Sequence, residues 1–190
     1  MIQILELIKH LGLGIASLII CNITMADIKN TKDFMKAIDE VRLEYPEDAA
    51  ERKIPVSFIA TIAAAETGNF NFKGAPTAKK ANNFFGMHAT GEQDFITTTG
   101  GVNIRNFPDS KSSIRSFINL IANDERYKNV MDSVDKVEDM FQGMSPYAER
   151  KDYVNFLNSV YTTRIKPVIE TENMLVPKRK PMNQQMDYLQ

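Results

Sequence analysis

The chain has 190 residues, of which 43% are hydrophobic, and its 23 Lys and Arg against 24 Asp and Glu give a net charge of -1. The apolar fraction excludes a disordered chain, and 9 glycines without a period exclude a collagen-like one. A single Cys excludes an internal disulfide and a cysteine-built zinc site, and the balanced charge gives no reason to expect nucleic acid as a partner. The sequence therefore predicts one ordinary globular domain.

Residues 1–26 differ in character from the rest of the chain. Leu11–Ile20 carries no charge, Lys9 precedes it, and Ala26 supplies a small residue of the kind that a signal peptidase reads. These are the parts of a secretory signal, so we expect export to the periplasm or cell envelope, with cleavage after Ala26. The alternative is an uncleaved N-terminal anchor as the one contact with the membrane, although the apolar stretch is shorter than the ~20 residues that a spanning helix needs.

A lipoprotein signal is a third reading of the same segment. Cys21 ends the apolar stretch, but Ile20 stands where a lipoprotein signal has a small residue. Cleavage after Ala26 would instead remove Cys21 and leave a mature protein without cysteine, which suits an oxidising compartment.

Residues 27–170 are expected to form the folded domain, beginning with two helices. Apolar residues at helical spacing predict an amphipathic helix over roughly Thr31–Leu43. After Pro55, which suits the first position of a helix, Val56–Ala65 is nearly all apolar and predicts a helix buried on every side. Thr67-Gly68 ends that helix.

The middle of the domain predicts a hairpin. The segments Ile96–Thr99 and Val102–Asn106 are rich in β-forming residues and are separated by Gly100-Gly101. Before the hairpin the pattern is irregular, with one helical turn expected around Ala78.

Three more helices are expected after the hairpin. One opens at Pro108-Asp109-Ser110, one covers Val134–Phe141, and one starts near Pro146. From residue 171 the chain is polar and interrupted by proline, so residues 171–190 predict a loose tail.

Glu66 is the residue that most clearly points to chemistry. It follows three alanines at the end of the most apolar helix, where partial loss of solvent raises the pKa of a carboxyl. A carboxylic acid still protonated near neutrality is the proton donor that a glycosidic leaving group requires. The alternative is a Glu at a helix end that only reaches solvent or caps a neighbour.

The surroundings of Glu66 resemble the glucosaminidases of glycoside hydrolase family 73, in particular their Bax-like branch. Members carry an Ala-rich helix that ends in Glu-Ser/Thr-Gly, then an Asn-Asn-Leu-Phe-Gly segment, a hairpin and a Tyr-rich closing segment. The matching blocks stand in the same order over about Ile54 to Ile165: Ala63–Gly68, Asn82–Gly86, Ile96–Thr99 with Asp124–Tyr127, and Ser145–Arg150 with Tyr153, Val154 and Leu157.

The resemblance implies an endo-acting β-N-acetylglucosaminidase that cuts peptidoglycan glycan strands. The implied fold class is mainly α (α+β), a lysozyme-like helical domain with a small β-hairpin lobe and the substrate in the cleft between them. Glu66 matches the catalytic acid, and Tyr147 matches a Tyr that lines the cleft and is needed for activity. Asn83, Phe84 and Gly86 match the segment that forms the cleft floor. We expect a monomer.

The sequence departs from the family in two places. It has no Trp, so a stacking platform for sugar falls to Phe70, Phe72 or Phe85. The second carboxylate found on or beside the hairpin of several members is also missing, and Asp94 is a better candidate than Glu92 for its place. Alternatively, the N-acetyl group of the substrate acts as the nucleophile.

No metal or cofactor is expected. His10 lies in the leader and His88 is then the one histidine left, which makes no metal site. Two other functions remain open: a lytic transglycosylase, which also uses one Glu on a lysozyme-like fold, and a non-catalytic glycan-binding domain that kept the fold and lost the activity.

Overall fold

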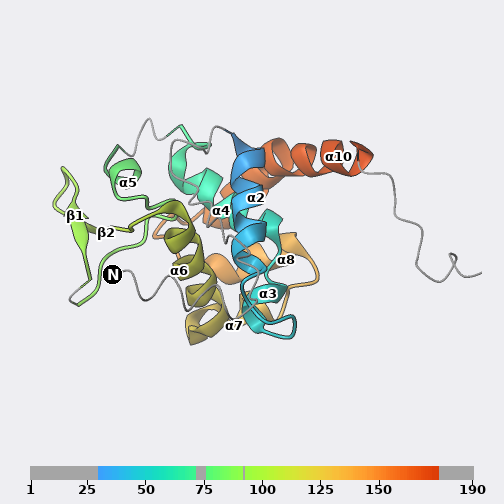
Figure 1. Ribbon diagram of the computed structural model, residues 1–190, viewed down its shortest axis with the longest axis horizontal. Coiled ribbons are helices and arrows are strands. Elements are labelled where there is room, and N and C mark those ends of the chain that lie inside the picture. The colour runs from blue at the N-terminus through green and yellow to red at the C-terminus, as the bar shows by residue number, and fades with distance from the viewer. Residues whose placement is uncertain (1–29, 72–75, 92, 176–190) are drawn as a thin grey trace, which may run out of the picture.

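The computed structural model describes residues 30–71, 76–91 and 93–175. The signal peptide or anchor expected in residues 1–26 lies outside these ranges, as do Phe72, Glu92 and residues 176–190. The described chain folds into a helical body with a two-stranded sheet and α5 at one end and α10 at the other (Figure 1). The mainly α (α+β) fold class is thereby confirmed.

Helices make up most of the described elements. In chain order the elements are α2 (Thr31–Arg42), α3 (Ala50–Lys53), α4 (Val56–Thr67), α5 (Pro76–Lys80), β1 (Phe95–Thr97), β2 (Asn103–Arg105), α6 (Ser110–Asn123), the 3₁₀ turn η1 (Glu125–Tyr127), α7 (Lys128–Met131), α8 (Val137–Met140), the 3₁₀ turn η2 (Phe141–Met144), α9 (Tyr153–Val160), the π-helical η3 (Tyr161–Ile165) and α10 (Lys166–Leu175).

Helix α4 is the centre of the core. Eight of its residues are buried, among them Phe58, Ile59 and Ile62, and it packs against α2, α8, α9 and η3. It begins after Pro55 and ends at Gly68, whose left-handed backbone (φ 62°) closes the last turn. The predicted burial on every side is therefore confirmed. Packing on all sides fixes the position of α4 and of Glu66 near its C-terminal end.

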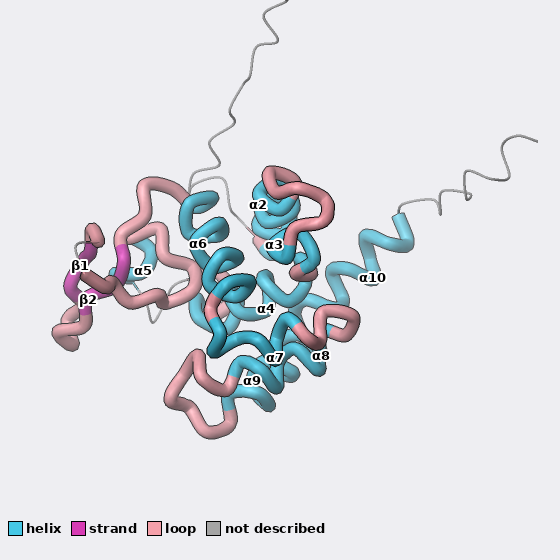
Figure 2. Tube along the Cα trace, turned by 90° about the horizontal axis from the view of Figure 1, so that it is seen from below, coloured by secondary structure: helices cyan, strands magenta, loops and turns pink. Residues whose placement is uncertain are grey.

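Helices α2 and α6 pack together beside α4 (Figure 2). The Asn30 side chain caps α2 by accepting a hydrogen bond from the Asp33 amide, and Asp109 caps α6 by accepting one from Ser112. The buried residues of both helices recur at three- and four-residue spacing, as the sequence predicts.

The predicted hairpin is also confirmed. Strands β1 and β2 are antiparallel, with Ile96 opposite Ile104, and an isolated bridge joins His88 to Ile104. The hairpin is thereby fastened to the loop that follows Asn83, so that loop and hairpin form one lobe (Figure 1).

The last part of the domain differs from expectation in its helix limits. Helix α9 begins at Tyr153 rather than near Pro146, because the exposed charged stretch 149–152 offers no apolar face to bury. The helix predicted over Val134–Phe141 is shorter, starting at Val137 and passing into η2.

Three stretches of helix were not expected, and the first is the short α3 in the charged stretch after Pro46. The short helices η1 and α7 lack a periodic pattern and depend on a local cap, in which the Asp124 side chain accepts from the Arg126 amide. Helix α10 reaches Leu175, so residues 171–175 are helical where a loose tail is predicted. Within the described residues no helix combines the length and apolar character that crossing a membrane would require.

Candidate active site

Glu66 is the last side chain but one of α4 and stands where the helix leaves the core. Its side chain is half-buried, and the Tyr153 hydroxyl donates a hydrogen bond of 2.7 Å to Oε1. Burial raises the pKa of the Glu66 carboxyl above its ordinary value, and the Tyr153 bond offsets part of this rise. The carboxyl is therefore held towards the protonated form, as its sequence context predicts.

The second carboxyl oxygen faces Gly86. A Cβ at Gly86 would lie 3.2 Å from Glu66 Oε2, and the backbone there has a φ of +63°. Only glycine combines this conformation with so close an approach. Gly86 thus leaves Oε2 uncovered on the side where a ligand would lie.

Tyr147 completes the group around the acid. Its hydroxyl donates to the Phe85 carbonyl over 2.5 Å, and its ring stacks at 6.3 Å on that of Tyr153. Burial and the nearby Glu66 charge raise the pKa of Tyr147 well above its usual range, and those two causes also raise the pKa of Tyr153. Both tyrosines consequently keep their protons and act as hydrogen-bond donors.

The chain turns sharply directly after the acid. Gly68, Asn69 and Phe70 follow one another in the left-handed region, with φ values of 62°, 63° and 65°. The Thr67 hydroxyl accepts from the Phe70 amide and so fixes the turn. Such strained backbone is costly, and it is found preferentially at functional sites.

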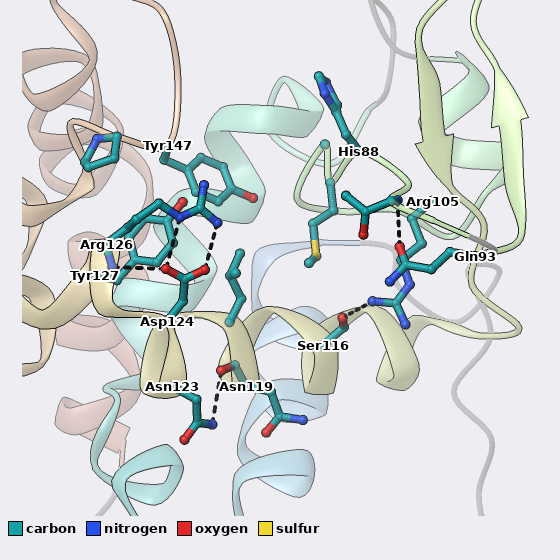
Figure 3. A pocket seen from close by; sticks show the side chains of 15 residues that line it. His88, Gln93, Arg105, Ser116, Asn119, Asn123, Asp124, Arg126, Tyr127 and Tyr147 are labelled. Carbon is teal, nitrogen blue, oxygen red and sulfur yellow. Dashed lines mark hydrogen bonds and ion pairs between the residues drawn. The ribbon is translucent and has the colours of Figure 1, made fainter.

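A groove of about 820 Å³ runs from this group between α6 and the hairpin lobe (Figure 3). Gly86 and Tyr147 belong to its lining, whereas Glu66 does not and lies directly behind Gly86, its Oε2 3.2 Å from where a Cβ of that residue would be. Further lining residues come from both sides: Met87, His88, Thr90, Gln93 and Arg105 from the lobe, Ser116, Asn119, Leu120 and Asn123 from α6, and Asp124, Arg126, Tyr127 and Pro146 beyond it.

Asp124 is a carboxylate in this lining but cannot serve as a second acid. The Arg126 guanidinium donates to both of its oxygens, at 3.0 and 2.8 Å, and these bonds lower the pKa of Asp124 to about 2. Asp124 and Arg126 therefore form an ion pair with no net charge.

Asp94, the candidate for the second catalytic carboxylate, is exposed and does not line the groove. Its Oδ2 accepts a hydrogen bond of 2.7 Å from Asn106, and its carbonyl accepts one from the Asn106 amide. Through these bonds Asp94 links the two ends of the hairpin at its base. Glu92, the other acid considered, lies outside the described residues.

Three of the expected substrate-binding residues need correction. Phe84, Phe85 and Asn83 are 0% exposed, so none of them offers a surface to sugar. Phe84 packs on Phe34 and Phe85 stacks on Phe117, with ring centroids 4.6 and 4.1 Å apart. The sequence could not show this, because an aromatic residue beside a glycine suits a core and a platform equally well.

The Asn83 side chain instead forms buried hydrogen bonds that link two backbone segments. It donates to the Met87 and Arg105 carbonyls and accepts from the Met87 amide. Phe70 is half-buried and packs on Phe34 at 5.0 Å, and it does not line the groove. Of the expected binding residues, Gly86 alone borders the groove, and Tyr147 lines it as expected.

Tyr153 is the functional residue that sequence reasoning missed. It is buried, as is Leu157 one helical turn later, so the spacing of the two alone indicates a core position. Only its bond to Glu66 distinguishes it from other core residues. No group of three or more potential metal ligands occurs in the part of the chain that the structure describes.

A half-buried acid at the end of a core helix, beside a groove between a helical body and a hairpin lobe, is the arrangement of a lysozyme-like glycoside hydrolase. Residues 44–166 match the Glucosaminidase family, described as mannosyl-glycoprotein endo-beta-N-acetylglucosaminidase. The match spans well over half of the chain, and the chain therefore belongs to this family of glycoside hydrolases.

Solved structures agree with this fold. The glycoside hydrolase domain of Salmonella typhimurium FlgJ is 20% identical, with a TM-score of 0.56 over 77% of this chain and 94% of that one. A peptidoglycan hydrolase from Sphingomonas sp. A1 is 16% identical, with a TM-score of 0.57 over 84% and 99%. The catalytic domain of the Listeria monocytogenes autolysin Auto is 17% identical, with a TM-score of 0.52 over 70% and 83%.

At these identities the likeness establishes the lysozyme-like fold. A sequence search among curated proteins finds no match.

Proposed function

We propose that this glycoside hydrolase is an endo-β-N-acetylglucosaminidase that cuts peptidoglycan glycan strands, with Glu66 as the general acid. The observation that carries the proposal is the state of the Glu66 carboxyl, which burial holds towards its protonated form at the end of the groove. One of the similar structures is by its printed name a peptidoglycan hydrolase and another is an autolysin, which supports this substrate class.

The position of the acid proton follows from the hydrogen bonds. Oε1 accepts from Tyr153, so in the protonated acid the proton sits on Oε2, the oxygen that faces Gly86. From there it passes to the glycosidic oxygen as the bond from that oxygen to the sugar carbon breaks. The Tyr153 hydroxyl then stabilises the carboxylate that remains.

The attacking group comes from the other face of the sugar. Asp124 is neutralised by Arg126 and Asp94 is bonded to Asn106, so neither is poised as a nucleophile. This favours attack by water or by the substrate's own N-acetyl oxygen, a route that some glycosidases use.

The test compares wild type with Glu66→Gln on purified cell-wall sacculi. The variant keeps the size of the side chain but removes the acid, and we expect turnover to fall by about 10²- to 10⁴-fold. Glu149→Gln, at an exposed residue outside the groove lining, is the matched control. Near-normal lysis by Glu66→Gln would overturn the proposal.

Thermal unfolding must accompany that test. Because folding raises the pKa of the Glu66 carboxyl, the folded protein becomes less stable as the pH rises and that carboxyl loses its proton. Glu66→Gln removes this cost, so at neutral pH the variant should unfold at the same or a higher temperature. If Glu66→Gln loses activity without losing stability, the loss is due to removal of the acid and not to unfolding.

Mass spectrometry of the products separates the remaining candidate activities. Reducing N-acetylglucosamine ends support the proposal. Anhydro-muramic ends would mean a lytic transglycosylase, which the absence of a free acid from the described groove lining also suits. Binding without any product would mean a non-catalytic glycan-binding domain.

We propose further that the protein is exported through residues 1–26. The support is the sequence alone: an uncharged stretch after Lys9 and a small residue at Ala26. Fusing residues 1–26 to a reporter enzyme that is active only outside the cytoplasm tests export, and the N-terminal sequence of the mature protein tests cleavage. An inactive fusion would end this part of the proposal.

A further inference from the structure

The charges in the groove do not balance. Its described lining holds two guanidinium groups, Arg105 and Arg126, and the single carboxylate Asp124. Asp124 and Arg126 neutralise each other at 2.8 Å. Arg105 takes part in no ion pair among the described residues, so it leaves one positive charge in a groove whose other lining groups are mostly amides and hydroxyls.

Arg105 is held in place by neutral groups only. One of its terminal nitrogens donates to the Ser116 hydroxyl at 2.6 Å, and its guanidinium lies 4.7 Å from the centre of the Phe107 ring. Figure 3 shows it reaching from the hairpin lobe towards α6. A guanidinium has five N–H donors, so this tether positions the group and leaves donors for a ligand.

The neighbour of Arg105 adds a further donor. The Gln93 carbonyl oxygen accepts from the Thr90 amide, which leaves the Gln93 NH₂ group directed at other partners. Figure 3 shows Gln93 beside Arg105 on the same wall of the groove. Two groups that donate hydrogen bonds, one of them charged, match a ligand group that accepts hydrogen bonds and carries negative charge.

Arg105 is also in a fixed relation to the acid. Its amide donates to the Met87 carbonyl, and Asn83 ties the carbonyls of both residues together. Met87 follows Gly86, the residue that faces Glu66 Oε2. A group bound at Arg105 is therefore placed relative to the bond that Glu66 would protonate.

We propose that Arg105 binds a carboxylate carried by the substrate strand, so that the groove selects anionic, peptide-bearing glycan over neutral glycan. The inference rests on the proposed function and names the feature of peptidoglycan that this site reads. The carboxylate belongs either to the stem peptide or to the lactyl group of muramic acid once the peptide has been removed. Both have the same chemistry, and Arg105 is in either case a specificity-determining residue.

The experiment compares native sacculi with sacculi whose carboxylates have been converted to amides. Wild type should prefer native sacculi, as the ratio of the two kcat/KM values. In Arg105→Gln that ratio should fall by roughly 10- to 100-fold, the factor that corresponds to a lost hydrogen bond to a charged group. The loss should lie mainly in KM, and Arg105→Lys should restore part of it.

Two controls separate recognition from structure. Arg115→Gln removes a cation from α6 that is already paired with Glu44 outside the groove, and it should leave the ratio as in wild type. Ser116→Ala removes the tether of Arg105 and should lower the ratio by less than Arg105→Gln does.

Strands stripped of their peptides by an amidase identify the source of the carboxylate. If the Arg105→Gln deficit seen on native sacculi disappears on stripped strands, Arg105 reads the stem peptide alone, and if it persists there, Arg105 also reads the lactyl carboxylate that stripping exposes. An equal deficit of Arg105→Gln on native and amidated sacculi, or none on either, would overturn the inference. Failure of wild type to cut any sacculi would overturn the proposed function instead.

Discussion

The two walls of the groove are built in different ways. On the helical side, Glu66, Tyr147 and Tyr153 converge through side-chain contacts from the end of α4 and the closing segment. On the hairpin side, the Asn83 side chain bonds to the Met87 and Arg105 carbonyls, and Arg105 enters the groove without an ion pair to any residue that the structure describes. In the proposed function, the helical wall therefore supplies the proton donor, whereas the hairpin wall positions and selects the strand.

This difference follows from how the two walls are stabilised. A core helix buried on every side fixes a carboxyl in a partly dry place, where its pKa rises. A two-stranded hairpin has little core of its own and keeps its polar side chains in water. Asp94, at the base of the hairpin, is exposed.

The largest effect is expected where the two walls meet, at Gly86. In Gly86→Ala the new Cβ would press on Glu66 Oε2 from 3.2 Å in a backbone conformation that disfavours side chains. Displacing the acid by a fraction of an ångström to 1 Å should lower kcat by about 10²-fold. Gly91→Ala is the matched control, with a φ of +61° and nothing within 4 Å. Equal losses in both variants would mean that backbone strain alone is responsible.

Tyr153→Phe tests the helical wall by itself. The hydroxyl bond lowers the pKa of Glu66, so its loss should raise that pKa and move the alkaline limb of the pH–rate profile to higher pH. Turnover should fall by roughly 10- to 100-fold, because the bond to the charged form is worth roughly 1.5–3 kcal/mol. Tyr161→Phe, whose ring packs on Phe141, should move neither quantity. A limb displaced to lower pH would contradict the assignment.

Asn83→Ala tests the hairpin wall. It leaves the Met87 amide and two carbonyls without their buried partner, and we expect the free energy of unfolding to fall by about 1–3 kcal/mol, with a smaller loss of activity. Denaturant titration measures the first quantity. Asn158→Ala, which loses one bond within its own helix, should cost less. If the two variants are equally stable, the Asn83 hydrogen bonds do not stabilise the hairpin side of the groove.

Asp94→Asn should have the smallest effect. Asp94 is exposed and bonded to Asn106, and substitutions at such positions change the free energy of unfolding by about 0.5 kcal/mol or less. Because Asp94 does not line the groove, kcat/KM should also stay within about twofold of wild type. A hundredfold loss would make Asp94 the second carboxylate and transfer part of the chemistry to the hairpin wall.

Much of the fold could be predicted because its signals are local. The spacing of apolar residues in α2 and α6, the Pro108-Asp109-Ser110 opening of α6 and the Gly100-Gly101 turn each act within a few residues. The limits of α9 and α10 were harder to predict, because charged residues and long-range packing, rather than pattern, decide where those helices begin and end.

The site was predictable to a lesser extent. Glu66 stands out in the sequence because a carboxylate after three alanines and a run of buried residues is chemically out of place unless it has a task. The roles of Phe85, Asn83 and Tyr153 depend on contacts with residues distant in the chain, such as the Tyr153 bond to Glu66. Neither composition nor spacing records such contacts.

The sequence by itself therefore determined the class of domain and the buried helix that ends in Glu66, the acid proposed here. Periodicity and burial are properties of single segments and can be recognised in them. Only the tertiary structure decided which tyrosine bonds to the Glu66 carboxyl, which phenylalanines enter the core and which arginine of the groove lining has no ion pair among the described residues. These are outcomes of distance in space, and the chain specifies them through packing.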